Sequence, residues 1–342
     1  MDPLTQGVLG AALPQATYAG NGSTRKYQIA IAGALGMLGG MAADLDVLIR
    51  SNTDPLLFLV YHRQFTHSLA FIPIGGLIVG FVLHWVLGRR WQLRFWQTVL
   101  LCSLGYATHA LLDTATSYGT MLLWPFVDTR YALNIISVVD PLFTVPLALS
   151  VLWAAVRGRP GLARIGLVWA LLYLGAGWWQ HQTAREMAIA LADSRGHNPV
   201  RLEVKPSFGN IVVWKSIYEV DGTFHVDAIR PRIASAVIEG DSVRKLDTAR
   251  DFPWLSPESQ QARDIDRFVH FSDGYAAVDP ANASRVIDAR YSFVPNEISA
   301  LFSIELAEDA RPSSHVRYVS HRERAREQFG RLWHLIAGWV SP

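Results

Sequence analysis

The sequence predicts an α-helical polytopic membrane bundle of five to six membrane segments, followed by a mainly β extracytoplasmic domain. The 342 residues are 50% hydrophobic with a mean hydropathy of +0.17, which is more apolar than an ordinary soluble enzyme. Charged residues are scarce in the first half of the chain and frequent in the second, where β-branched and aromatic runs begin. These observations predict a membrane domain at 1–180, a soluble β-rich domain at 181–318 and a C-terminal amphipathic helix at 319–342.

Five apolar stretches are long enough to span a bilayer, which takes roughly 20 residues of helix. They lie at about 28–49, 67–88, 95–115, 136–156 and 162–180. The shorter stretch 3–19 is expected to form a short or half-spanning helix. Gly36 with Gly40, and Gly76 with Gly80, are small residues four apart, which predicts close packing of their helices against neighbours.

Basic residues between these stretches predict the orientation in the membrane. They are Arg25 and Lys26, then Arg89, Arg90 and Arg94, then Arg157, Arg159 and Arg164. Their loops are expected to be cytoplasmic by the positive-inside rule. The loops 50–66 and 116–135, and the chain after 181, are then expected on the outer side. The N-terminus lacks the basic region of a cleavable signal peptide, so the first segments are expected to direct insertion.

The second half carries strand patterns. Strands are expected at 200–205, 211–220, 223–230, 234–239, 268–278 and 290–294. Asp221-Gly222 between two of these runs predicts a β-hairpin turn. The stretch 319–340 is expected to be an amphipathic helix resting on the membrane or on the β domain.

Six ionisable residues stand at those ends of the apolar segments that the topology places at the outer face. They are Asp44, Asp46, His62, His67, His109 and Asp113. Ionisable groups in apolar helices usually face a cavity or a partner. His109 and Asp113 are four apart and share a helix face, where they are either metal ligands or a polar pair joining two helices.

The pattern therefore predicts a divalent metal site for Zn²⁺ or Mn²⁺, with one or two ions. The expected ligands are Asp46, His67, His109 and Asp113, with Asp44 and His62 completing a second position or orienting the first. The single cysteine, Cys102, excludes a thiolate-rich zinc site.

Three further residues near these segments have alternative roles. Arg63 either holds an anionic substrate group or contacts phospholipid. Asp140 either caps the helix that follows it or has a role in the site, as a further ligand, a hydrogen-bond partner of a histidine ligand or a general base. Asp44 is the other candidate for the general base. Thr66 is expected to cap the helix that begins near His67.

With these residues identified, the chain resembles the bacterial inner-membrane metal-dependent hydrolase family, the YdjM-like group, over about residues 1–180. The matching segments are Met1–Thr5, Ala43–Asp46, His62–Ser68, Gly105–Asp113 and Thr116–Phe126. The resemblance implies a divalent-metal hydrolase of the cytoplasmic membrane that uses the six Asp and His residues above. Many members have a histidine where this chain has Gln6, and glutamine is a poor ligand for transition metals.

The expected function is a metal-dependent hydrolase that activates water at the periplasmic membrane interface. The expected substrate is a lipid-linked ester or phosphoester, with membrane lipid as partner, and the net charge of +2 gives no reason to expect nucleic acid. A transporter or metal permease using the same cluster is the alternative, although transport sites usually lie near the midplane. A non-enzymatic scaffold, whose β domain binds an envelope partner, is the third hypothesis.

Overall fold

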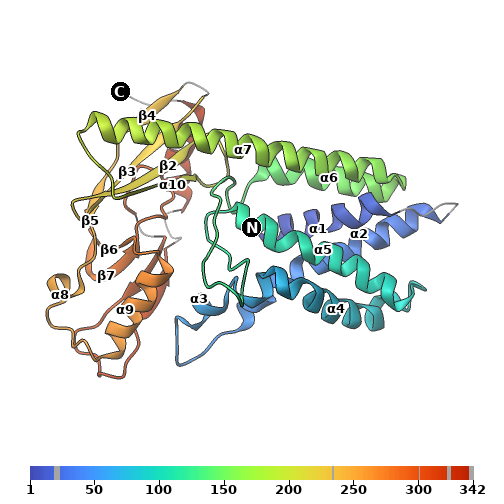
Figure 1. Cartoon of the computed structure of the whole chain (residues 1–342), viewed down its shortest axis with the longest axis horizontal. Helices are drawn as coiled ribbons and strands as arrows, with labels where there is room; N and C mark the ends of the chain where they lie inside the picture. The colour runs from blue at the N-terminus through green and yellow to red at the C-terminus, as the bar shows by residue number, and fades with distance from the viewer. Residues whose placement is uncertain (19–23, 233–234, 300, 322–324, 339–342) are drawn as a thin grey trace. The chain divides into compact units, whose positions relative to one another are not determined.

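Helices form most of the first half of the chain and antiparallel strands most of the second (Figure 1). This computed structural model describes residues 1–18, 24–232, 235–299, 301–321 and 325–338. Two units can be distinguished. The first comprises Met1–Ile49, Tyr61–Trp178 and Phe208–Asn210, and the second comprises Arg50–Val60, Trp179–Ser207 and Ile211–Pro342.

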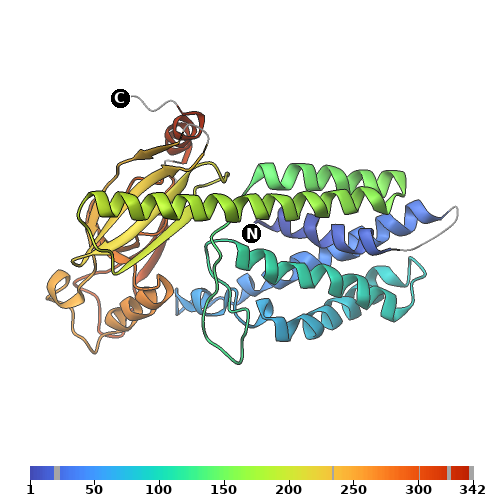
Figure 2. The same ribbon diagram turned by 45° about the horizontal axis from the view of Figure 1, so that its top comes forward.

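The first unit is a bundle of long helices whose axes run side by side (Figure 2). They are α1 (Pro3–Thr17), α2 (Arg25–Ala42), α4 (Ile72–Leu83), α5 (Phe95–Ala115), α6 (Pro141–Arg157) and the first part of α7 (Pro160–Ser194). In the described part of the chain, three helical stretches are long and apolar enough to cross a membrane, namely Arg25–Leu48, Leu69–Gly88 and Pro160–Ser194. The count of five to six spans stays a prediction.

Many large apolar side chains of this unit are exposed. Along α4 they include Ile74, Ile78 and Phe81, and α6 and α7 present similar rows, with Leu149 and Leu171 among their members. A soluble domain rarely exposes apolar patches of this extent, so this surface suits a lipid environment. The 35 residues of α7 correspond to about 50 Å of helix, and the helix continues well beyond the expected end at residue 180.

Glycines bring α1, α2 and α5 into backbone contact. A Cβ atom added to Gly105 on α5 would lie 2.0 Å from the carbonyl oxygen of Gly36 on α2. One added to Gly40 would lie 2.7 Å from the backbone oxygen of Gln6 on α1. Gly76 packs equally closely on Ser103 of α5. The predicted close approach at these small residues is therefore confirmed, and it places the end of α2 directly against α5.

The second unit contains two antiparallel sheets. One has the order β1-β2-β3-β4, with β5 also paired to β3, and the other has the order β6-β7-β8-β9. The strands are β1 (Arg201–Pro206), β2 (Trp214–Val220), β3 (Thr223–Arg230), β4 (Ala236–Ile238), β5 (Ser242–Arg244), β6 (Ala276–Asp279), β7 (Asn282–Asp288), β8 (Phe302–Glu305) and β9 (Arg317–Ser320). The helices α8 (Thr248–Asp251), α9 (Gln260–Phe271) and α10 (Ala325–Ala337) accompany them. Ile217, Phe224, Tyr275 and Ile287 belong to a buried core that draws on both sheets.

The hairpin prediction is confirmed, because Val220 pairs with Thr223 and both Asp221 and Gly222 have positive φ. The expected strand 268–278 is wrong in its first half. Its first four residues complete α9, in which Ile265, Phe268 and Phe271 are buried at helical spacing.

The strand expected at 290–294 is also wrong. The backbone there leaves the sheet after β7, which ends at Asp288, and the Arg290 side chain turns back to bind Asp288. Of the expected stretch 234–239, residue 234 lies outside the described residues, and strand β4 occupies Ala236–Ile238.

Candidate metal centre

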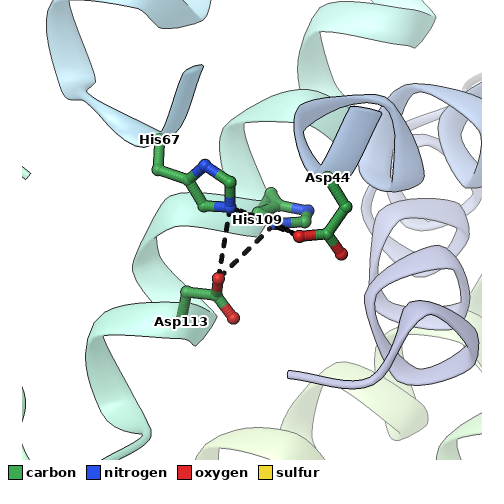
Figure 3. A group of neighbouring side chains, drawn as sticks. All are labelled: Asp44, His67, His109 and Asp113. Atoms are coloured by element: carbon green, nitrogen blue, oxygen red, sulfur yellow. Dashed lines mark hydrogen bonds and ion pairs between the residues drawn. The ribbon is translucent and has the colours of Figure 1, made fainter. Parts of the chain in front are cut away.

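The aspartates of the site sit where α2 tightens into a 3₁₀ helix, η1 (Ala43–Leu48). A 3₁₀ helix has three residues per turn, so side chains two apart point in different directions. Asp44 points toward His67 and His109 (Figure 3). Asp46 points toward His62, and its Oδ1 lies 2.8 Å from His62 Nδ1. The two aspartates therefore serve two adjoining groups of side chains.

His109 and Asp113 lie one turn apart on α5, and both are fully buried. Their spacing puts His109 Nε2 3.6 Å from Asp113 Oδ2. The sequence prediction that this pair shares one helix face is confirmed.

His67 ends a short 3₁₀ turn, η2 (Phe65–His67), which follows α3 (Leu57–Tyr61). Between these elements Arg63 adopts a left-handed backbone conformation, with φ 60°. Such a conformation costs a residue with a Cβ atom roughly 1–2 kcal/mol. The Arg63 N–H donates to Asp46 Oδ2 at 3.0 Å, and its carbonyl accepts from Met121 N at 3.0 Å. These two bonds stabilise the turn that presents the histidines.

Four potential ligand atoms meet at one point. Nε2 of His67 and Nε2 of His109 are 2.9 Å apart, and Asp44 Oδ1 lies 3.5 Å from the first and 3.4 Å from the second. Asp113 Oδ2 lies 3.3 Å from His67 Nε2. A tetrahedral zinc site with bonds of about 2.0–2.1 Å separates its ligand atoms by about 3.3 Å. Five of the six separations among these atoms lie between 2.9 and 3.6 Å, close to that spacing.

The hydrogen bonds of His109 determine which of its nitrogens can bind a metal. Nδ1 of His109 lies 2.5 Å from the carbonyl oxygen of Gly40. A carbonyl oxygen only accepts hydrogen bonds, so Nδ1 carries the hydrogen. In the neutral ring Nε2 then presents a lone pair to the centre of the group.

The same reasoning applies to His67. The Thr66 hydroxyl donates to Asp46 Oδ2 at 2.8 Å, because a carboxylate can only accept. Since its hydrogen is used there, the Thr66 oxygen accepts from His67 Nδ1 at 2.9 Å. Asp46 Oδ2 also lies 3.3 Å from that nitrogen. Nε2 of neutral His67 therefore presents a lone pair toward His109, in the histidine–carboxylate arrangement common around bound metals.

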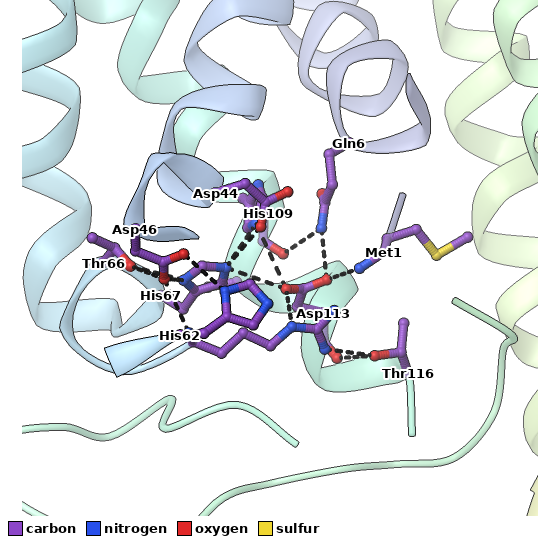
Figure 4. A network of polar contacts seen from close by, with 12 residues as sticks. Met1, Gln6, Asp44, Asp46, His62, Thr66, His67, His109, Asp113 and Thr116 are labelled. Carbon is purple, nitrogen blue, oxygen red and sulfur yellow. Dashed lines mark hydrogen bonds and ion pairs between the residues drawn. The ribbon is translucent and has the colours of Figure 1, made fainter. Parts of the chain in front are cut away.

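Several groups contact the carboxylate of Asp113 (Figure 4), and two of them hold Oδ1, the oxygen directed away from the histidines. Oδ1 accepts from Gln6 Nε2 at 2.8 Å and is in contact with the backbone nitrogen of Met1. Nε of Arg63 forms an ion pair with Oδ2 at 3.0 Å, and within the described structure neither atom has a hydrogen-bond partner. Gln6 thus positions the carboxylate, and Oδ2 faces both Arg63 and the two histidines.

The remaining candidates have other surroundings. The Arg63 guanidinium is buried, donates to Thr116 Oγ1 at 3.0 Å and stacks over Tyr118. Asp140 caps α6 by accepting from Phe143 N, and it also accepts from Tyr173. The structure does not bring Asp140 into either group of potential ligands. Its action as a base, and contact of Arg63 with substrate, stay predictions.

Several supporting residues were missed in the sequence. The expected cap at Thr66 is wrong, because Ser68 accepts from Phe71 N and Thr66 instead joins Asp46 to His67. Thr116 and the Gly40 carbonyl also lacked any local signal. A threonine directly before a site histidine was the only available indication for Thr66.

The family match covers the helical first half of the chain. A family model described as YdjM inner membrane protein matches residues 1–184. YfhP, an uncharacterized protein of Bacillus subtilis (strain 168), is 28% identical over 132 residues, which are 38% of this chain and 39% of YfhP. The inner membrane protein YbcI of Escherichia coli (strain K12) is 29% identical over 157 residues, or 43% of this chain and 83% of YbcI. The match to YfhP thus spans well under half of that relative's length. No solved structure matches the chain.

Proposed function

Because the chain belongs to the YdjM inner membrane protein family, we propose that it is a membrane-embedded hydrolase that depends on a divalent metal. The apolar helices and the family support a membrane location. The proposed site is the group Asp44, His67, His109 and Asp113, in which every potential ligand atom lies within 4.8 Å of the others. Zn²⁺ or Mn²⁺ is the proposed ion.

One observation carries the proposal. The Nε2 atoms of two imidazoles lie 2.9 Å apart, each ring has its Nδ1 hydrogen-bonded elsewhere, and a carboxylate oxygen stands on either side. When both rings are neutral, each Nε2 presents a lone pair to the other. Four electron-rich atoms at this distance repel one another unless a cation lies among them. Either a metal ion or a proton shared by the histidines meets that need. Two nitrogen and two oxygen ligands are a common set for Zn²⁺. A proton shared by the two histidines would account for their close contact, but it would not account for the two carboxylate oxygens placed around them.

A divalent ion held there would lower the pKa of a bound water and so supply hydroxide near neutral pH. The protein residues then have separate tasks. Gln6 and Arg63 hold Asp113, while Thr66 and Gly40 fix the orientation of the two imidazoles. In a site with a single ion, the second oxygen of Asp44 would be available to accept a proton from the attacking water.

The proposed substrate is an ester or phosphoester linked to a lipid, at the periplasmic surface of the inner membrane. Two arguments support this. The positive-inside rule puts the loops next to the cluster on the outer side, and the helices that carry the cluster expose apolar surface that suits lipid. A substrate anchored in the bilayer would reach such a site by diffusing in the membrane.

Elemental analysis of the purified full-length chain tests the metal. The wild type is compared with His109→Ala and Asp113→Ala, and with His84→Ala as a control histidine, which is hydrogen-bonded to Thr98 and lies outside both groups of potential ligands. We expect bound metal in the wild type and the control and a loss of it in the two site variants. If all four proteins contain the same amount of metal, below one ion per chain, the proposed metal site is refuted.

A hydrolysis assay on phosphoester and lipid-ester substrates tests the activity separately. We expect turnover by the metal-loaded wild type that falls by at least about 100-fold in His109→Ala. Bound metal without hydrolysis of any substrate, together with metal uptake into vesicles, would favour the permease alternative.

A further inference from the structure

The aspartate pair on η1 connects the metal centre to a second group of ligands. Asp44, Asp46 and His62 offer ligand atoms that again lie within 4.8 Å of one another. Asp44 belongs to both groups. A carboxylate has two oxygens, and Oδ1 of Asp44 is the one that faces the two histidines of the first group.

We propose that the site holds two divalent ions bridged by Asp44, and that the outer ion, bound by Asp44, Asp46 and His62, is the one that contacts substrate. This inference rests on the proposed function. Paired ions about 3.5–4 Å apart are common in enzymes that hydrolyse phosphoesters, where they act on both the attacking and the leaving oxygen.

Exposure distinguishes the two positions. In the inner group His67, His109 and Asp113 have side chains that are 0% exposed, whereas the side chains of Asp44 and His62 are each 18% exposed. The inner position has four potential protein ligands, of which Asp44 alone is partly exposed, and four protein ligands are typical of a structural site. In a two-ion site the outer ion would therefore take over the activation of water that a single inner ion would otherwise supply. The outer position has three protein ligands and an open side, which is typical of a catalytic site.

Asp46 couples the two positions. Its Oδ1 lies 2.8 Å from His62 Nδ1, and its Oδ2 lies near the hydrogen-bearing Nδ1 of His67. One carboxylate therefore serves as a ligand for the outer ion and as a support for a ligand of the inner ion. Arg63 N and the Thr66 hydroxyl hold Oδ2 in place, so Oδ1 remains directed outward.

The charges agree with two cations. Asp44, Asp46 and Asp113 supply three carboxylates within one small volume, and Arg63 and the ammonium group of Met1 oppose them at Asp113. Carboxylates this close together raise each other's energy unless cations intervene. The rival interpretation is that Asp46 orients His62 as a general base beside a single ion.

Titration of the metal-free full chain with Mn²⁺ distinguishes these readings. The sample is chelator-treated protein in detergent, and bound Mn²⁺ is counted and followed by electron paramagnetic resonance. We expect two ions per wild-type chain and a spectrum of two exchange-coupled ions. His62→Ala, and the more conservative His62→Asn, should bind one ion and give an uncoupled spectrum, while His84→Ala should behave as the wild type. A helix-content measurement by circular dichroism confirms that each variant is folded.

The outcomes separate this inference from the proposed function. A wild type that binds one ion, with the same single ion in His62→Ala, refutes the outer site and leaves the metal-dependent hydrolase intact. Two ions in both the wild type and folded His62→Ala show that His62 is not a ligand and also refute it. A wild type that binds no Mn²⁺ or Zn²⁺ refutes both proposals together.

Discussion

Replacement of Thr66 by valine tests the orientation of the His67 ring, on which the metal site depends. Valine keeps the branched shape but removes the hydroxyl that accepts from His67 Nδ1 at 2.9 Å and donates to Asp46 Oδ2 at 2.8 Å. Loss of a hydrogen-bond partner behind a metal-binding histidine typically lowers metal affinity 10–100-fold. Asp46 Oδ2 remains 3.3 Å from Nδ1 and can still accept its hydrogen. The expected loss of zinc affinity is therefore at the lower end of this range, about tenfold, or about 1.4 kcal/mol of binding free energy.

Competition with a fluorescent zinc chelator measures this affinity on the purified protein. Thr66→Ser is the matched control, because it keeps the hydroxyl and should bind zinc within about twofold of the wild type. The backbone at this position stays anchored in both variants, since Tyr106 donates to the Thr66 carbonyl at 2.7 Å. An unchanged affinity in Thr66→Val, or an equal loss in Thr66→Ser, would contradict the assignment of hydrogens on which the site is argued.

Three further predictions concern packing, charge and the isolated carboxylate. Gly105→Ala places a Cβ atom 2.0 Å from a backbone oxygen of α2 and should destabilise the protein by about 1–3 kcal/mol in thermal unfolding, whereas Gly175→Ala, with nothing within 4 Å, should not. Burial lowers the pKa of Lys215 to about 7 from 10.5, so the unfolded chain binds more protons and stability rises with pH across that interval. Lys215→Met should therefore raise the melting temperature at pH 8 and reduce the increase of melting temperature with pH. A melting temperature that depends on pH as it does in the wild type would contradict this prediction. Asp140→Asn should leave metal content unchanged, since the residue lies outside both groups of potential ligands, and a loss of metal would show otherwise.

The candidate ligands were recognisable in the sequence because ionisable residues are conspicuous in apolar segments. His109 and Asp113 needed only the helical period to be placed on one face, and the loop charges placed Asp44 and His67 at the same end of the bundle. Their convergence in the structure follows from close helix packing, which Gly36 and its neighbours already indicated.

The partners that orient these residues were not recognisable, because hydrogen bonds between distant parts of the chain have no local sequence pattern. The Gly40 carbonyl holds His109, yet glycine at that position is explained just as well by packing alone. Thr66 stands at a predicted helix start, where a cap is the usual expectation. Asp140 shows the opposite case, since the local rule for a capping residue described it correctly.

The loop Arg50–Val60 shows why composition cannot assign every segment to its unit. It lies between membrane segments, yet it clusters with the second unit. Arg267, 213 positions away, binds both oxygens of Asp54 at 2.9 Å, and the Phe58 ring packs edge-on against Tyr318 at 5.0 Å. Composition is a local property, whereas these contacts join residues far apart in the chain.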